Sequence, residues 1–277
     1  MKKQILLVPN FEITSEIIKN IKKLIKGKCT HSKSYITLDN ISKEEATTVL
    51  AYLNTVGTYE ISQDKDYYTT NELLEFEYFY CSGQQKPDVG IDFINFELEL
   101  NGNDSFDYTD YCTKCKNGIQ QIKPFVVKGL SSKYESKKFV TPFWTYWIVS
   151  TYFKEKIIEQ NITGVDFWDL FNSKGQASKT NFQMKPKNVL QNVLSLKDVN
   201  CKKDCPMCDN MRVGIKGEVV KLHKESKEKL LDFNELKEHN MSKLNGMYII
   251  SKKLLQIFID ENILPHKDID VTPVEFI

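Results

Sequence analysis

Two cysteine pairs are the residues in this chain whose type and spacing could do chemistry. Cys112 and Cys115 stand in YCTKCKNG, and Cys205 and Cys208 stand in KDCPMCDN. Two thiols at CxxC spacing can share a metal ion or close a redox-active disulfide. Four thiolates in a tetrahedron form the closed shell of a structural zinc site. We therefore predict one structural Zn²⁺ ion bound by Cys112, Cys115, Cys205 and Cys208.

The fold must bring the two pairs together. A zinc ribbon has about 15 to 20 residues between its pairs, whereas 89 residues separate Cys115 from Cys205. Cys201 is an alternative ligand, and a redox role for either pair is the minor alternative, because neither lies in a thioredoxin-like strand, CxxC, helix context. Cys29 and Cys81 are expected to be small buried hydrophobic side chains.

The first part of the chain has a pattern of short strands and amphipathic helices. Residues 3–8 and 34–38 are typical of strands, and helices are expected after the caps Thr14 and Ser42. Further along, aromatic and acidic residues alternate in ELLEFEYFY and in GIDFINFELEL, which predicts strands with one apolar and one charged face. We predict an N-terminal α/β region with acidic strands over residues 1–110.

The second part of the chain contains two similar segments. Residues 147–162, WIVSTYFKEKIIEQNI, align without a gap against residues 248–263, YIISKKLLQIFIDENI. Ser150 and Ser251 stand at the same position in the alignment and are expected to cap helices, not to act as nucleophiles. Each segment follows a CxxC pair and precedes a strand-like stretch, GVDFWDL or DVTPVEFI, which indicates an internal duplication.

These patterns predict an α+β protein with two domains. The N-terminal α/β unit is followed, over residues 111–277, by a duplicated strand-helix-strand region that the zinc site clips together. The aromatic cluster FWTYW at 143–147 is expected to pack in a core or an interface.

Acidic residues are concentrated in one stretch. Residues 60–110 contain thirteen acidic side chains and two lysines, a net charge of −11 in a chain whose total charge is +1. Solvated strand faces would explain this stretch. A docking surface would also explain it, because a local negative field speeds the encounter with a basic protein. The candidate partner-binding residues are Glu72, Glu75, Asp104, Asp107 and Asp110.

Several classes of protein are disfavoured. The apolar run before Pro9 is too short for a signal peptide or a membrane span, so a cytoplasmic protein without a membrane partner is expected. Arg212 is the only arginine, and lysine cannot copy the bidentate guanidinium contact with bases, which counts against sequence-specific DNA binding. The motifs of P-loop proteins, HExxH metalloproteases, GxSxG hydrolases and Rossmann dinucleotide-binding proteins do not occur, so no enzyme is expected.

Residues 111–277 resemble the double-CXXCG motif immunity proteins found beside bacterial polymorphic toxins. The resemblance rests on the two CxxC pairs and on the closing segment YIISKKLLQIFIDENILPHKDIDVTPVEF at 248–276. The glycine that follows the second cysteine of each pair in that family is replaced here by Lys116 and by Asp209.

The resemblance implies a protein that binds and neutralises a cognate toxin inside the producing bacterial cell. Toxins that act on nucleic acid are commonly basic, so such a partner would suit the acidic stretch. The alternative is a zinc-knuckle protein that binds nucleic acid, which would need a basic face with stacking aromatic side chains.

Overall fold

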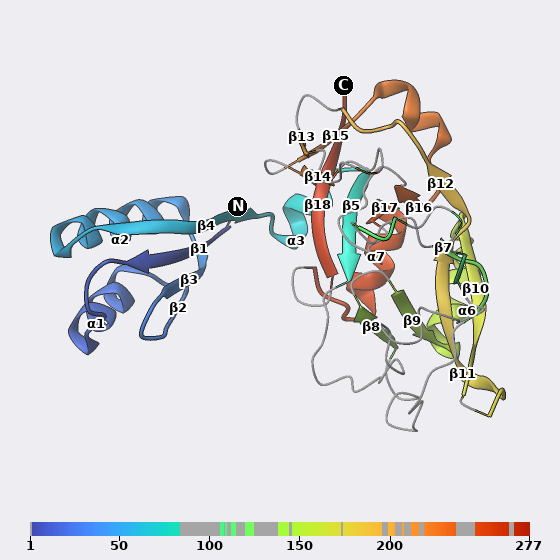
Figure 1. Cartoon of the computed structure of the whole chain (residues 1–277), viewed down its shortest axis with the longest axis horizontal. Coiled ribbons are helices and arrows are strands. Elements are labelled where there is room, and N and C mark those ends of the chain that lie inside the picture. The colour runs from blue at the N-terminus through green and yellow to red at the C-terminus, as the bar shows by residue number, and fades with distance from the viewer. Residues whose placement is uncertain are drawn as a thin grey trace. The chain divides into compact units, whose positions relative to one another are not determined.

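The chain forms two units, an N-terminal unit, Met1–Glu75, and a C-terminal unit, Phe76–Ile277 (Figure 1). The computed structural model describes residues 2–83, 106–107, 109, 112–114, 120–124, 138–143, 146–172, 174–195, 199–202, 207, 212–215, 219–236, 247–265 and 269–277. Both helices and strands occur, as expected for an α+β protein. In this described part, no helix is both long enough and apolar enough to cross a membrane.

The N-terminal unit is a four-stranded antiparallel sheet with two helices. Its elements are β1 (Lys2–Pro9), α1 (Ser15–Leu24), β2 (Lys28–His31), β3 (Ile36–Ile41), α2 (Lys43–Val56), β4 (Tyr59–Tyr67) and the short α3 (Thr70–Leu73). The strand order is β2-β3-β1-β4, with every pair antiparallel. This order and the β-α-β-β-α-β succession make the ferredoxin-like arrangement.

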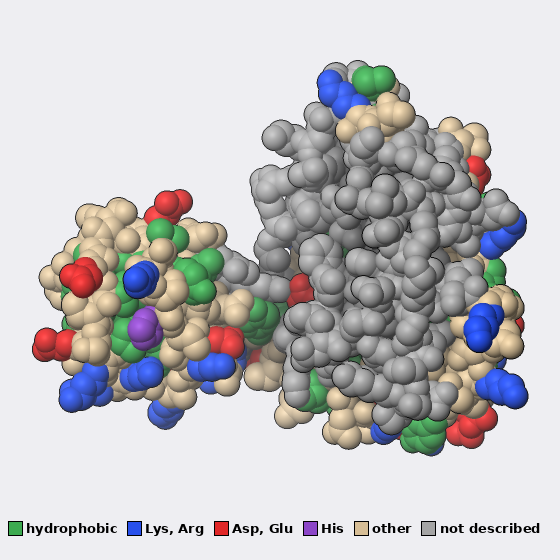
Figure 2. Space-filling view, turned by 60° about the horizontal axis from the view of Figure 1, so that its bottom comes forward, with side chains coloured by type: hydrophobic (Ala, Val, Ile, Leu, Met, Phe, Trp, Pro, Cys, Tyr) green, Lys and Arg blue, Asp and Glu red, His purple; other side chains and the backbone are tan. Residues whose placement is uncertain are grey.

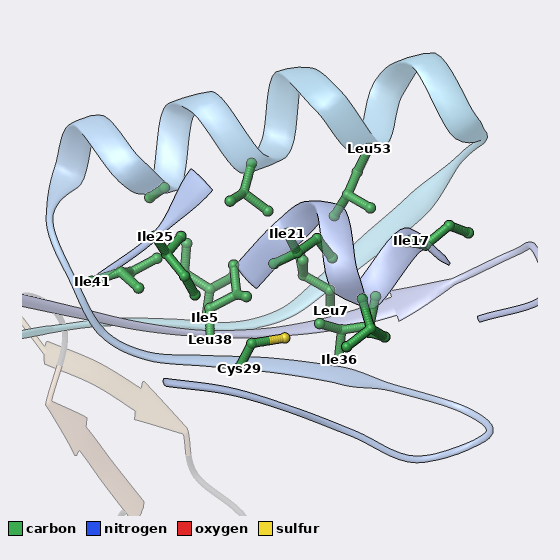
Figure 3. Packing of buried hydrophobic residues seen from close by; sticks show 13 residues of the cluster. Ile5, Leu7, Ile17, Ile21, Ile25, Cys29, Ile36, Leu38, Ile41 and Leu53 are labelled. Atoms are coloured by element: carbon green, nitrogen blue, oxygen red, sulfur yellow. The ribbon is translucent and has the colours of Figure 1, made fainter. Parts of the chain in front are cut away.

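Both helices of this unit begin where the sequence predicts. The Thr14 hydroxyl accepts from the Ile17 N–H, and the Ser42 hydroxyl accepts from the Glu45 N–H while the Glu45 carboxylate accepts from the Ser42 N–H. Such caps satisfy N–H groups that have no partner inside the helix. The helices then bury their apolar faces against the sheet in a cluster of thirteen residues (Figure 3). The N-terminal unit therefore has a hydrophobic core of its own.

The C-terminal unit contains two larger sheets. One has the order β10-β11-β9-β8, and the other has the order β12-β16-β17-β5-β18-β15. The first sheet is built from β8 (Phe139–Phe143), β9 (Tyr146–Ser150), β10 (Val165–Phe171) and β11 (Ala177–Pro186). The second is built from β5 (Tyr78–Gly83), β12 (Asn188–Leu190), β15 (Val220–Leu222), β16 (Phe233–Leu236), β17 (Met247–Ser251) and β18 (Ile269–Phe276). Helix α6 (Thr151–Glu159) follows β9, helix α7 (Lys252–Asp260) follows β17, and a 3₁₀ helix, η2 (Lys224–Lys229), precedes β16.

Two expectations differ from the structure around β5. The alternating stretch 72–80 is a strand only from Tyr78 onward, because a capping box between Thr69 and Glu72 starts the helical turn α3. Strand β5 pairs with β17 and β18, so it belongs to the C-terminal unit. The division thus falls after Glu75 and differs from the predicted boundary at 110/111. The other alternating stretch, 90–100, lies outside the described residues.

The two similar segments have the same local structure. In each, a strand runs directly into a nine-residue helix. The Ser150 hydroxyl accepts from the Phe153 N–H at 3.3 Å, and the Ser251 hydroxyl accepts from the Leu254 N–H at 3.2 Å. Both serines are helix N-caps, as predicted.

Both helices also end in the same way. Asn161 and Asn262 have positive φ angles of 49° and 61°, a conformation that asparagine tolerates and that ends a helix. The next residue in each case is an isoleucine whose N–H donates back to the last turn, from Ile162 to the Ile157 carbonyl and from Ile263 to the Phe258 carbonyl. The shared ending Asn-Ile therefore has a structural cause.

The strand register around the two helices matches as well. Asn181 of β11 lies opposite Ser150, and Tyr78 of β5 lies opposite Ser251. Strand β10 pairs with the other side of β11, and β18 pairs with the other side of β5. Each helix thus connects two strands of one sheet that have one strand between them. Along the chain, the intervening strand β11 follows α6, whereas the intervening strand β5 comes long before α7.

An aromatic cluster joins the two segments in the core of the C-terminal unit. The fully buried Trp147 stacks on Phe233 with ring centres 4.9 Å apart and also contacts Tyr248 and Phe258 at 4.9 and 5.5 Å. Stacked and edge-to-face pairs of this kind add to the stability that burial provides. Trp147 is thus a core residue, as predicted for the FWTYW cluster.

Candidate functional site

Both CxxC pairs lie in the connections of two-stranded antiparallel ribbons. Strands β6 (Phe106–Asp107) and β7 (Gln120–Gln121) pair with Asp107 opposite Gln120, and their connection contains Cys112 and Cys115. Strands β13 (Val199–Lys202) and β14 (Arg212–Ile215) pair with Lys202 opposite Arg212, and their connection contains Cys205 and Cys208. Each CxxC pair therefore stands between two strands that pair with each other, which the sequence did not reveal.

The described residues include only part of the predicted ligand set. Cys112 is buried, with 9% of its surface exposed, whereas Cys115, Cys205 and Cys208 lie outside the described residues. Cys201 is in β13, opposite Val213. Within the described ranges, no three His, Cys, Asp or Glu side chains are grouped closely enough to hold a metal ion.

Two other cysteines are buried in apolar surroundings. Burial raises the pKa of the Cys29 thiol and raises that of the Cys81 thiol well above its ordinary value. A raised pKa keeps both thiols protonated and unreactive near neutral pH. Cys29 and Cys81 are thus small hydrophobic core residues, as predicted.

The ribbon of the first pair is attached to the sheet that contains β11. The side-chain amides of Gln121 and Gln183 exchange two hydrogen bonds of 2.8 Å each, and Gln183 is almost fully buried. The Lys185 ammonium donates to the Gln121 carbonyl oxygen at 3.4 Å. These contacts link β7 to β11, so the sheet that contains β11 holds one strand of the first cysteine ribbon.

The predicted acidic contacts have different surroundings. The Glu72 carboxylate accepts from the Thr69 N–H and hydroxyl, both at 2.8 Å, and therefore caps α3. Asp107 accepts from the Thr109 N–H and hydroxyl at 2.9 and 2.6 Å, which stabilises a local turn. Glu75 is exposed. Asp104 and Asp110 lie outside the described residues.

Part of the acidic stretch also has a structural explanation. Strand β4 is at the edge of its sheet, with Asp66 opposite Lys3 of β1. Charged residues on an edge strand discourage pairing with other chains. On the face of the N-terminal unit seen in Figure 2, the acidic side chains stand apart from one another, so its described residues form no acidic patch there.

No family model matches the chain. A comparison with the curated proteins gives no match either.

Asp232 connects the loop after α6 to the start of α7. Its carboxylate accepts from the Thr163 N–H and hydroxyl, both at 2.8 Å, and from the Ser251 hydroxyl at 2.6 Å. Burial would raise the pKa of this carboxyl, but the hydrogen bonds from Ser251 and Thr163 outweigh it and lower the pKa. The folded state therefore favours the ionised form of Asp232.

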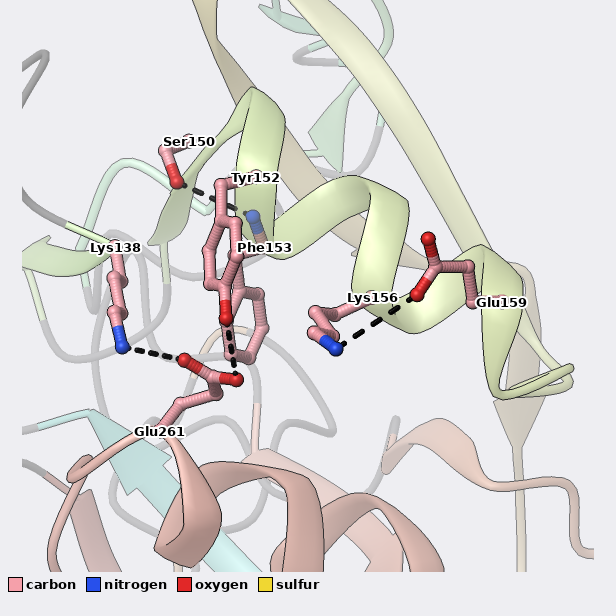
Figure 4. A network of polar contacts seen from close by, with 7 residues as sticks. All are labelled: Lys138, Ser150, Tyr152, Phe153, Lys156, Glu159 and Glu261. Atoms are coloured by element: carbon pink, nitrogen blue, oxygen red, sulfur yellow. Dashed lines mark hydrogen bonds and ion pairs between the residues drawn. The ribbon is translucent and has the colours of Figure 1, made fainter.

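Lys138 stands before the first segment in the same place as Asp232 stands before the second. The Ser150 N–H donates to the Lys138 carbonyl as the Ser251 N–H donates to the Asp232 carbonyl. The Lys138 ammonium lies 2.5 Å from the Glu261 carboxylate, which also accepts from the Tyr152 hydroxyl at 2.9 Å (Figure 4). Asp232 thus contacts Thr163, which follows α6, and Lys138 contacts Glu261, which follows α7. Sequence reasoning missed both, because the partners are far apart along the chain.

We predict that Asp232→Asn lowers the free energy of unfolding by about 1–3 kcal/mol at pH 7, because hydrogen bonds to a charged group are lost. A lowered pKa means that the Asp232 contribution is fully present above the ordinary carboxyl pKa of about 3.9 and disappears as pH falls towards the lower folded-state value. The difference between wild type and variant should therefore be constant from pH 7 to about 5 and then shrink. Urea denaturation across this range measures it.

The matched control is Asp169→Asn, since Asp169 is exposed on β10 and no contact of its carboxylate with another described residue is seen. Its effect should stay within about 0.5 kcal/mol. Equal effects of the two substitutions, or a difference for Asp232→Asn that grows on acidification, would contradict the role given to Asp232.

Proposed function

We propose that this chain is a bacterial immunity protein that binds and neutralises a cognate toxin in the cytoplasm, and that it acts by binding without catalysing a reaction. The observation that carries the proposal is the common setting of the two CxxC pairs. Each lies in the connection of an antiparallel ribbon and is followed by a strand, a Ser-capped helix and a further strand. The resemblance to the double-CXXCG motif immunity proteins, which rests on these pairs and on the closing segment at 248–276, supplies the proposed role.

An internal duplication is part of the proposal. The order of elements supports it, because β5, the first ribbon, β8, β9, α6 and β10 correspond to β11, the second ribbon, β16, β17, α7 and β18. In this interpretation β5 and β11 are exchanged, since each lies in the sheet of the other copy. The equal register of Ser150 and Ser251 with these strands supports the exchange.

A structural Zn²⁺ ion bound by Cys112, Cys115, Cys205 and Cys208 is also proposed. The donor set fits zinc, because four thiolates close its tetrahedral shell without an open position. The low exposure of Cys112 supports a thiol that is turned away from solvent. When bound, the ion would supply a cross-link between the two ribbons and no catalytic chemistry.

The partner surface of the proposal is the acidic stretch around residues 60–110, facing a basic toxin. Of the three candidate contacts that the structure describes, Glu75 has the greatest freedom to meet a partner, because it is exposed and caps no described element. Glu72 and Asp107 already bind local backbone groups, so their contribution would be to the electrostatic field. Asp104 and Asp110 complete the proposed set.

The alternative, a zinc-knuckle protein that binds nucleic acid, has less support. Bases stack on free aromatic faces. Two described aromatic rings are covered by lysines, with the Lys185 ammonium 3.7 Å from the Trp168 ring centre and the Lys154 ammonium 3.7 Å from that of Phe182. A negative field over residues 60–110 also repels phosphates.

Co-expression with the product of the neighbouring gene tests the proposed function. That product alone should arrest growth, and the intact chain should restore growth and co-purify with it. Charge reversal at Glu75, Asp104 and Asp110 should slow association and reduce its salt dependence, with Asp107 left intact to keep its turn. A neighbouring product that neither harms the cell nor binds the chain would reject the proposal, and strong retention on heparin would favour the alternative.

A further inference from the structure

A basic groove lies between α6 and α7. Its volume is about 320 Å³. It is lined at the end of α6 by Lys156 and Gln160 and along α7 by Lys252, Lys253, Gln256 and Asp260. Three ammonium groups and one carboxylate therefore surround it.

The positive charge of this groove is weakly compensated. Lys252 makes no side-chain hydrogen bond or ion pair with another described residue, and the Lys253 ammonium donates only to the carbonyl of Asn161, at 3.2 Å. Lys156 lies 3.8 Å from the carboxylate of Glu159, which is 64% exposed, so that pair is weak. The Asp260 carboxylate accepts from the Gln256 amide at 2.8 Å.

The opposite end of the same helix pair is built differently. Tyr152 stands where Lys253 stands in the aligned segments, and Glu261 stands where Gln160 does. There the Tyr152 hydroxyl and the Lys138 ammonium both bind the Glu261 carboxylate, so the acidic and basic groups satisfy each other (Figure 4). At the groove, Lys252 has no ion pair with a described residue, Lys156 has only the exposed Glu159, and the charge of Lys253 acts on the Asp232 carboxylate without a hydrogen bond to it.

We propose that the groove binds an acidic segment of a protein partner, an extended peptide that presents two or three carboxylates. Helices of nine residues are about 13 Å long, so the groove between them could take roughly four residues of extended chain. Carboxylates match the lysine charges and the amide donors of Gln160 and Gln256. The lining contains no aromatic side chain for base stacking and no arginine for bidentate phosphate binding, which disfavours nucleic acid.

Fluorescence anisotropy with a labelled hexaglutamate peptide tests the inference on the full-length chain. Wild type should bind the peptide at low salt, and Lys252→Glu/Lys253→Glu should weaken binding at least tenfold. Glutamate is favourable in the first turn of a helix, so this variant should keep the fold. The matched control is Lys19→Glu/Lys33→Glu, which changes the net charge equally at two exposed positions of the N-terminal unit and should bind within twofold of wild type.

Absence of saturable binding, or an equal loss in both double variants, would overturn the inference. Inorganic tripolyphosphate and a thymidine oligonucleotide are the competing probes. If either binds more tightly than the peptide and loses affinity in Lys252→Glu/Lys253→Glu, the groove is a phosphate site and the inference fails. Because no toxin is used, none of these outcomes affects the proposed immunity function.

Discussion

Replacing Cys205 with serine is expected to abolish zinc binding and to destabilise the C-terminal unit. We expect purified wild type to contain one zinc ion per chain by elemental analysis. A structural Zn²⁺ ion binds zinc-finger peptides with apparent binding free energies of ~10–16 kcal/mol. If only a few kcal/mol of this is coupled to folding here, the melting temperature of a unit of this size should fall by about 10 °C or more.

The two-unit organisation supplies an internal reference for this experiment. The N-terminal unit has its own core of thirteen residues, so its unfolding transition should be unchanged in Cys205→Ser and after removal of metal with a chelator. Cys201→Ser should keep one zinc ion per chain. A metal-free wild type that is fully folded would contradict the site, and loss of metal in Cys201→Ser would contradict the proposed ligand set.

Replacing Trp147 with alanine is expected to lower the free energy of unfolding by about 3–5 kcal/mol, the usual cost of removing a large buried aromatic side chain. Trp147 is fully buried, and its ring contacts Phe233 of β16, Tyr248 of β17 and Phe258 of α7. The substitution therefore removes contacts between the two halves of the unit as well as buried area. Chemical denaturation monitored by circular dichroism measures the loss.

Two further variants show where the energy resides. Trp168→Ala should cost much less than Trp147→Ala, because Trp168 is only partly buried on β10. A double-mutant cycle between Trp147 and Phe233 should give a coupling of about 0.5–1.5 kcal/mol, as for other aromatic pairs. Similar losses for the two tryptophans, or no coupling to Phe233, would show that the aromatic cluster does not join the segments.

Much of the candidate site was open to prediction from spacing alone. The two CxxC pairs were evident, and so was the equivalence of Ser150 and Ser251. The local hydrogen bonds of Glu72 and Asp107 could also be predicted from the sequence. Thr69 precedes Glu72 at capping-box spacing, and Thr109 follows Asp107 at the spacing of a local turn. These spacings indicate local hydrogen bonds of Glu72 and Asp107. The high density of acidic residues favoured a docking surface as the explanation instead.

Long-range contacts were not open to prediction. Asp232 and Thr163 lie far apart in the chain, and the sequence contains no periodicity that joins them. The pairing of β5 with β17 and β18 could not be predicted for the same reason. Because β5 continues the alternation of acidic and aromatic residues, it was assigned to the N-terminal unit.

The sequence by itself determined where α1, α2, α6 and α7 begin, which serines cap helices, where the two CxxC pairs stand and which two segments are alike. These features depend on side chains within a few residues of one another, so their energies are set locally. Only the tertiary structure decided that β5 joins the second sheet, that β11 joins the first, and that Asp232 and Lys138 reach across to the other segment. A strand pairs with whichever edge buries its apolar face best, and that choice depends on residues a hundred or more positions away.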